Sequence, residues 1–133
     1  MSKIIATIKE IRNVDNLNIV EFEFHKNSLK MVSLNLNKEV AIGKKIALSI
    51  KPTHILISKN FIEEISVSNQ LKAKIDQVEN GQLLSNILLR VEDTILESII
   101  TVDSSKRMKL KEDEEVVVLI KASDLFIQEV INE

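Results

Sequence analysis

The sequence contains no cysteine, no tryptophan and no tyrosine, and only two of its 133 residues are glycine. Without cysteine the protein has no disulfides, no thiolate metal ligands and no cysteine nucleophile. Two isolated glycines, Gly43 and Gly81, do not form the glycine-rich loop that cradles phosphate groups. No stretch of about 18 consecutive apolar residues is present, so we expect no membrane-spanning segment and no membrane partner.

A surplus of charge of one sign is also missing, because 18 basic residues nearly balance 20 acidic ones and the net charge is −2. This balance of charge argues against binding to the phosphate backbone of nucleic acids as the main function. Four phenylalanines without tyrosine or tryptophan are too few for the base-stacking surface of a single-strand nucleic-acid binder. We therefore expect no nucleic-acid partner. No basic and then apolar leader opens the chain, which predicts a cytoplasmic protein.

The hydrophobic 44% of the sequence is almost entirely aliphatic, with 20 isoleucines and 12 valines. Residues with branched β-carbons favour strands. Apolar and polar residues alternate in Ile19–Phe24 and Lys45–Lys51, as in half-buried strands. The segment SSKRMKL is predicted to be a short helix, with Asp103 or Ser104 as its N-cap.

An internal repeat divides the chain. Thr7–Leu17 resembles Lys74–Leu84, an offset of 74 − 7 = 67 residues, and further on Lys51 corresponds to Lys121. Each unit then has four or five short strands and one small helix, which fits an OB-like β-barrel.

The predicted fold is therefore all-β, with two tandem OB-like β-barrel domains, each with one short helix. The predicted domains are residues 1–65 and 66–133. The apolar residues Phe61, Ile62 and Ile65 at the junction predict a packed connection.

Groupings typical of catalysis are absent. His25 and His54 are the only histidines, about thirty residues apart, and no cysteine completes a zinc set with them. Both are expected to be ordinary surface histidines. We therefore predict no enzymatic activity, no metal-ion site and no organic cofactor.

Hydrogen-bond donors recur at equivalent places in the two units. A lysine at the end of an apolar strand, followed by a hydroxyl residue, supplies the charge and the directional donors that a small tetrahedral oxyanion needs. The same pattern also occurs where a strand simply ends in solvent, and spacing alone leaves both interpretations open. The donors are Ser66, Ser68, Asn69, Lys121, Ala122 (through its backbone N–H) and Ser123 in the second unit, and Lys51 and Thr53 in the first.

The same segments resemble a known family. SVSNQLKAKI from Ser66, SIIT from Ser98 and VVVLIKASDL before Phe126 resemble the Mop or molbindin domain, also called the TOBE domain. The whole chain thereby resembles a tandem di-Mop protein. The resemblance implies an OB-like barrel, oligomers with a pseudo-sixfold arrangement of domains, and molybdate or tungstate bound at interfaces between domains.

The resemblance also implies which residues bind the anion. Arginine is common in the family where this chain has Ser68, and glycine is common where it has Ala73. In the first unit Pro52 has no N–H to donate, so its site is expected to be weaker, selective for something else, or empty. Lys121 is therefore expected to contribute more than Lys51. The implied oxyanion-binding residues are Ser66, Ser68, Asn69, Lys121, Ala122 and Ser123, with Thr101 as a looser match, and Ser2, Lys51 and Thr53 in the first unit.

The leading interpretation is a cytoplasmic protein that binds molybdate or tungstate for storage or homeostasis and acts as a homo-oligomer, a trimer of these two-domain chains. Units of about 65 residues bury only a thin core alone, which favours association. The alternative is a detached ligand-sensing regulatory or interaction module that acts through a transporter or regulator partner.

Overall fold

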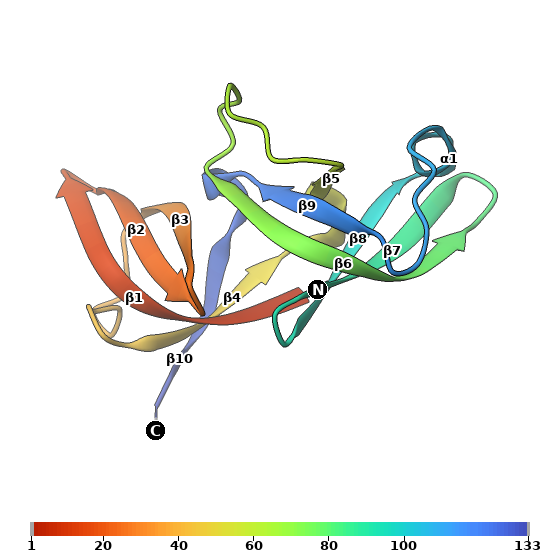
Figure 1. Cartoon of the computed structure of the whole chain (residues 1–133). Helices are drawn as coiled ribbons and strands as arrows, with labels where there is room; N and C mark the ends of the chain where they lie inside the picture. The colour runs from red at the N-terminus through yellow and green to blue at the C-terminus, as the bar shows by residue number, and fades with distance from the viewer. Residues whose placement is uncertain (1, 133) are drawn as a thin grey trace.

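The computed structural model describes residues 2–132, which form two five-stranded antiparallel sheets (Figure 1). The strand orders are β10-β4-β1-β2-β3 and β5-β9-β6-β7-β8. The all-β, tandem OB-like fold class is confirmed. The elements are β1 (Ser2–Val14), β2 (Leu17–Phe24), β3 (Asn27–Leu34), β4 (Lys45–Ile50), the 3-10 turn η1 (Pro52–His54), β5 (Leu56–Ser58), β6 (Asn69–Asn80), β7 (Leu84–Val91), β8 (Thr94–Thr101), α1 (Val102–Arg107), β9 (Glu115–Ile120), the 3-10 turn η2 (Ala122–Asp124) and β10 (Phe126–Ile131).

The two units repeat each other in backbone detail. β1 carries a bulge after Ile8 and β6 carries one after Ile75, at the offset of 75 − 8 = 67 residues found in the sequence. The loop before β4 bonds to the first bulge through the N–H of Gly43, and the loop before β9 bonds to the second through the N–H of Asp113, both at 2.8 Å. Both loop residues have positive φ, 89° and 68°. The sequence repeat is thus a structural repeat.

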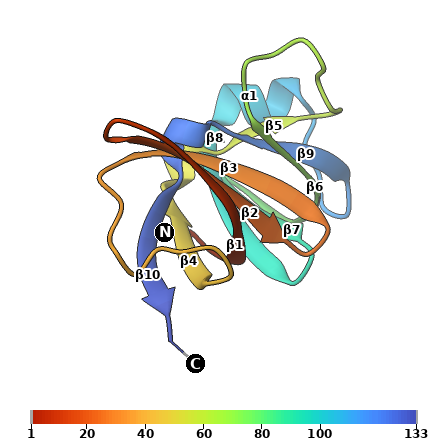
Figure 2. The ribbon, with the colours of Figure 1, turned by 90° about the vertical axis from the view of Figure 1, so that its left-hand side faces the viewer.

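Each unit contributes one strand to the sheet of the other unit. β5 pairs with β9 in the second sheet, and β10 crosses back to pair with β4 in the first. The crossing of β10 to the first sheet is visible in both ribbon views (Figures 1 and 2). The proposed boundary between residues 65 and 66 therefore separates the sequence repeats but not the sheets, and buried side chains of both units form one core.

Two side chains tie the units together at equivalent positions. The buried amide of Asn69 accepts from the backbone N–H of Lys30 at 2.7 Å and donates to its carbonyl at 2.9 Å. Ser2, the counterpart of Asn69 at the start of β1, accepts from the backbone N–H of Glu97 at 2.9 Å. The first residue of each long strand is thus bonded to an outer strand of the opposite unit.

The connections differ from the sequence prediction. α1 forms where a helix was expected, but its N-cap is Thr101, which accepts from the N–H of Ser104, and not Asp103 or Ser104. An α-helix forms only in the second unit, since the described part of the first has only the 3-10 turn η1. No helix among residues 2–132 is long and apolar enough to span a membrane.

The junction between the units is not the packed connection that its apolar residues predicted. Phe61 is 57% exposed, and Ile62 and Ile65 are 38% and 40% exposed. The loop is held instead by polar bonds, because the side-chain amide of Gln70 donates to the carbonyl of Ile62 and accepts from its N–H.

Candidate functional site

The two 3-10 turns bring the predicted donors of both units to one place. η1 follows β4 and η2 follows β9, and Lys51 and Lys121 are the extended residues just before them. The turns meet where the Nδ1 atom of His54 lies 3.6 Å from an Oδ1 atom of Asp124. Each turn also packs against the opposite unit, η1 against β8 and η2 against β3.

A pocket of about 200 Å³ opens between these turns. Lys51 and His54 from the first unit line it, together with Ser123, Asp124 and Phe126 from the second. We call it the η1–η2 pocket. It combines Lys51 and Ser123, which the sequence placed in two separate sets of donors.

The remaining donors of the second unit lie at the same end of the second sheet, at the start of β6 and just after β9. Asn69 pairs with Ile120, so the segment that precedes β6 and the segment that follows β9 lie next to each other. Ser66 and Ser68 are exposed on the first segment, and Lys121 is exposed on the second. Among residues 2–132, neither Lys121 nor Lys51 forms an ion pair.

Three predicted donors already have partners within the chain. The side chains of Asn69 and Ser2 form the bonds between the units described above. The hydroxyl of Thr101 caps α1 and also bonds to the hydroxyl of Ser104 at 3.0 Å. These bonds reduce what the three side chains can offer to a ligand, whereas Thr53 is exposed at η1 and Ala122 is half-buried at η2.

The sequence did not single out three of the pocket residues. His54 was expected to be an ordinary surface residue, and Asp124 and Phe126 were not considered. The repeat contains a signal for the first two, because the offset of 70 that aligns Lys51 with Lys121 also aligns His54 with Asp124.

A second histidine joins the units elsewhere. The Nε2 atom of His25, in the β2–β3 turn, lies 2.8 Å from an Oδ1 atom of Asp93 in the β7–β8 turn. The hydrogen bond from His25 lowers the pKa of Asp93 below its ordinary value. This pair lies at the edge of a hollow of about 650 Å³ that also includes Phe24 and Lys45. No three acidic or histidine side chains within residues 2–132 come close enough together to hold a metal ion.

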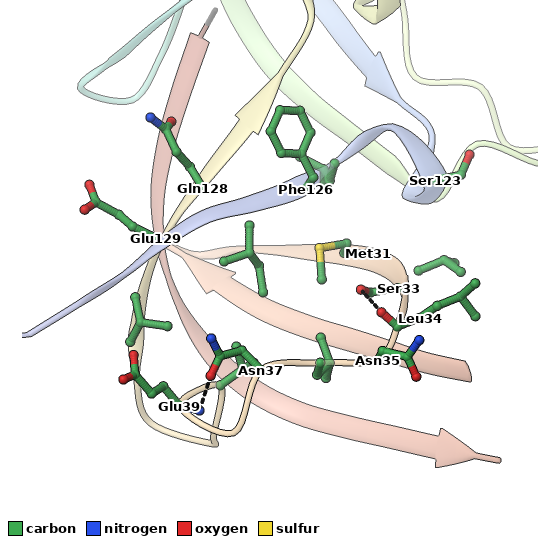
Figure 3. A pocket seen from close by; sticks show the side chains of 16 residues that line it. Met31, Ser33, Leu34, Asn35, Asn37, Glu39, Ser123, Phe126, Gln128 and Glu129 are labelled. Atoms are coloured by element: carbon green, nitrogen blue, oxygen red, sulfur yellow. Dashed lines mark hydrogen bonds between the residues drawn. The ribbon is translucent and has the colours of Figure 1, made fainter. Parts of the chain in front are cut away.

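A groove of about 740 Å³ with apolar and polar lining residues lies between β3 and β10, the two outer strands of the first sheet. Met31 and Leu34 from β3 and Phe126 from β10 contribute to it, and Ser123 lies at its end (Figure 3). Its only charged lining residues are Glu39 and Glu129. The groove therefore lacks the positive charge that an oxyanion site needs.

Comparisons with known proteins agree with this architecture. The family model of the TOBE domain matches residues 65–127, which confirms the resemblance over that part of the chain. A solved structure of the cytoplasmic molybdate-binding protein ModG, with molybdate bound, superposes with a TM-score of 0.87 at 18% identity, covering 94% of this chain and 93% of that one. This match shows the fold.

A molybdate-binding protein from Sporomusa ovata also matches, at 28% identity, over 53% of this chain and 100% of its own, with a TM-score of 0.46. No curated protein sequence matches the chain.

Proposed function

We propose that this protein, whose residues 65–127 match the TOBE domain, binds molybdate or tungstate and performs no reaction on it. The observation that carries the proposal is that the turns η1 and η2, each preceded by a strand-terminal lysine, meet at His54 and Asp124. Within residues 2–132, Lys51 and Lys121 are not ion-paired to any carboxylate, so they supply positive charge there. Charge-assisted hydrogen bonds of this kind hold oxyanions strongly.

The fold match adds independent support, since ModG is described as a molybdate-binding protein and matches this chain almost end to end. Ser66, Ser68, Ala122, Ser123 and Thr53 are the proposed neutral donors around the lysines. Asn69, Thr101 and Ser2 belong to the same proposed set, acting mainly by fixing the strand ends. The match gives no support of its own to the alternative of a regulatory module.

The cellular role that fits this chemistry is storage or homeostasis of the anion in the cytoplasm. ModG is described as cytoplasmic, and the sequence prediction for this chain is the same. A binder without catalytic groups acts by exchanging the hydration shell of a dianion for preorganised donors.

We further propose that the chain works as a trimer. Leu83, Val14 and Ile42 are exposed by 81%, 72% and 66%, more than isolated surface positions require. Large apolar side chains of this kind are covered when subunits associate. Light scattering at micromolar concentration tests this directly, and a monomeric mass would contradict it.

Calorimetric titration with molybdate, with sulfate as the control anion, tests the function. We expect molybdate to bind and the double variant Lys51→Ala/Lys121→Ala to lose most of that binding. The matched control is Lys72→Ala/Lys74→Ala, which removes two positive charges from exposed positions on β6. Thermal scans should show stabilisation of about 2.7 kcal/mol at a hundredfold excess over Kd with molybdate and none with zinc. If the parent protein shows neither binding heat nor thermal stabilisation with molybdate, the proposal is wrong.

A further inference from the structure

The proposed donors of each unit pack against an outer strand of the opposite unit. Those of the second unit lie at the start of β6 and at η2, and both segments contact β3, where the side chain of Asn69 bonds to the backbone N–H and carbonyl of Lys30. Those of the first unit lie at the start of β1 and at η1, and both segments contact β8. There Ser2 bonds to the N–H of Glu97, and the hydroxyl of Ser98 donates to the carbonyl of Ile55, just after η1, at 2.6 Å.

The residues of the outer strands at these two contacts have opposite charges. Lys30 and Glu97 are equivalent in the repeat, because 97 − 30 = 67 is the same offset that relates the two long strands. Lys30 lies next to the second unit's donors, since its backbone is bonded to the residue that follows Ser68. Glu97 lies next to the first unit's donors, since its backbone is bonded to Ser2. The repeat therefore places a positive residue at one set of donors and a negative residue at the other.

Neither charge is cancelled by an ion pair within residues 2–132. Glu21 is the direct partner of Lys30 on β2, but its carboxylate lies 3.5 Å from the ammonium group of Lys9. The carboxylate of Glu97 accepts from the side-chain amide of Asn86 at 3.1 Å, a neutral partner that fixes its position and leaves its charge. Both side chains are half-buried, where charges are screened less than in open solvent.

We propose that Lys30 is an additional oxyanion-binding residue of the second unit's site, and that Glu97 keeps the anion out of the equivalent site in the first unit. The ligand rests on the proposed function. A dianion interacts with each of these charges twice as strongly as a univalent ion does, so a lysine at one site and a carboxylate at the other separate their affinities. Each chain thus binds the anion at the second unit's donors, and the first unit's donors stay unoccupied.

Calorimetric titration of the full chain with molybdate tests the role of Lys30. Lys30→Gln should weaken binding about threefold to tenfold, whereas Lys30→Arg, which keeps the charge, should bind like the parent. Neither variant changes the backbone groups that Asn69 contacts, and urea unfolding without molybdate checks that the fold is intact. The matched control is Lys26→Gln, which removes the same charge from an exposed position in the β2–β3 turn. Equal affinities of Lys30→Gln and Lys26→Gln overturn the role of Lys30.

The same titration tests the role of Glu97. Glu97→Gln removes the charge and retains an oxygen that can accept from Asn86, so it should add a second, weaker class of sites with about one further anion per chain. The matched control is Glu92→Gln, at an exposed position in the β7–β8 turn, which should titrate like the parent. If Glu97→Gln titrates like Glu92→Gln, the role of Glu97 is overturned.

The parent protein separates this inference from the proposed function. We expect its titration to fit one class of sites, with about one anion per chain. Two anions per chain with equal affinity overturn the inference and leave the proposed function intact. A parent that binds no molybdate overturns both.

Discussion

The two units share the same arrangement of strands and turns, and they differ in one connecting segment and in the side chains at the turns. Both have the bulge in the long strand, the positive-φ loop residue bonded to it, and a 3-10 turn after the fourth strand of the repeat. After β8 the second unit forms α1, whereas the corresponding segment of the first unit, residues 35–44, forms no helix and borders the 740 Å³ groove. Connections vary at low cost because loop-closure entropy changes slowly with length.

The difference at the ligand-bearing turns is chemical. Pro52 begins η1 and has no N–H, whereas Ala122 begins η2 and retains one. His54 in the first unit stands where Asp124 stands in the second, and the Nδ1 atom of His54 lies 3.6 Å from an Oδ1 atom of Asp124. The two equivalent turns thus contribute different side chains to one pocket. The variants below test how far the two units differ in stability and in ligand binding.

The largest expected difference concerns the exchanged strands. A chain that ends at Leu125 lacks β10 and exposes the edge of β4, and it should lose roughly 3–5 kcal/mol of unfolding free energy through lost apolar burial and sheet hydrogen bonds. Ile57→Pro, which breaks the three-residue β5, should cost less because β5 makes fewer pairs. Urea unfolding followed by circular dichroism measures both, since the chain has no tryptophan or tyrosine for fluorescence. Equal losses would mean that the borrowed strands contribute equally.

The next difference concerns the two lysines. Lys121→Ala should weaken molybdate binding roughly tenfold to a hundredfold, because a charge-assisted hydrogen bond contributes about 1.5–3 kcal/mol. Lys51→Ala should weaken overall binding less, because Pro52 supplies no N–H beside it. Calorimetric titration with molybdate measures the affinity of both variants, with Lys72→Ala as the control. Parent-like binding by Lys121→Ala in an intact oligomer would show that this lysine is only a solvated strand end.

The sequence predicted the fold well because the fold depends on local signals. Alternating apolar residues predicted β2 and β4, and the repeat predicted the two units. β5 and β10 were missed because their partners, β9 and β4, lie in the opposite unit and leave no local pattern. The candidate site was predicted less completely. Asn69 looked like an anion donor because nothing in its neighbourhood reveals that it bonds to the backbone of Lys30, 39 residues away.

A smaller difference is expected between the two bonds that tie the units together. Asn69→Ala leaves the part-buried backbone N–H and carbonyl of Lys30 without their partner, at a cost of about 2 kcal/mol. Ser2→Ala removes one acceptor and should cost about 1 kcal/mol. Urea unfolding measures both against Lys72→Ala, an exposed position on the same strand as Asn69. A larger loss for Ser2→Ala would reverse the proposed order of the two contacts.

The smallest effect is expected for the contact between His25 and Asp93. The repeat aligns His25 with Glu92 and Asp93 with Lys26, and within residues 2–132 no ion pair joins Lys26 to Glu92. The hydrogen bond from His25 lowers the pKa of Asp93 in the folded protein. Its stabilising contribution is therefore present above the ordinary aspartate pKa of about 3.9 and is lost as the pH falls through the lower folded value. Asp93→Asn should lower the melting temperature slightly at neutral pH and converge with the parent near pH 3. His25→Gln should reproduce this convergence, because it removes the same bond. A variant that stays below the parent by the same margin at both pH values would show that the carboxylate contributes through packing and not through its charge.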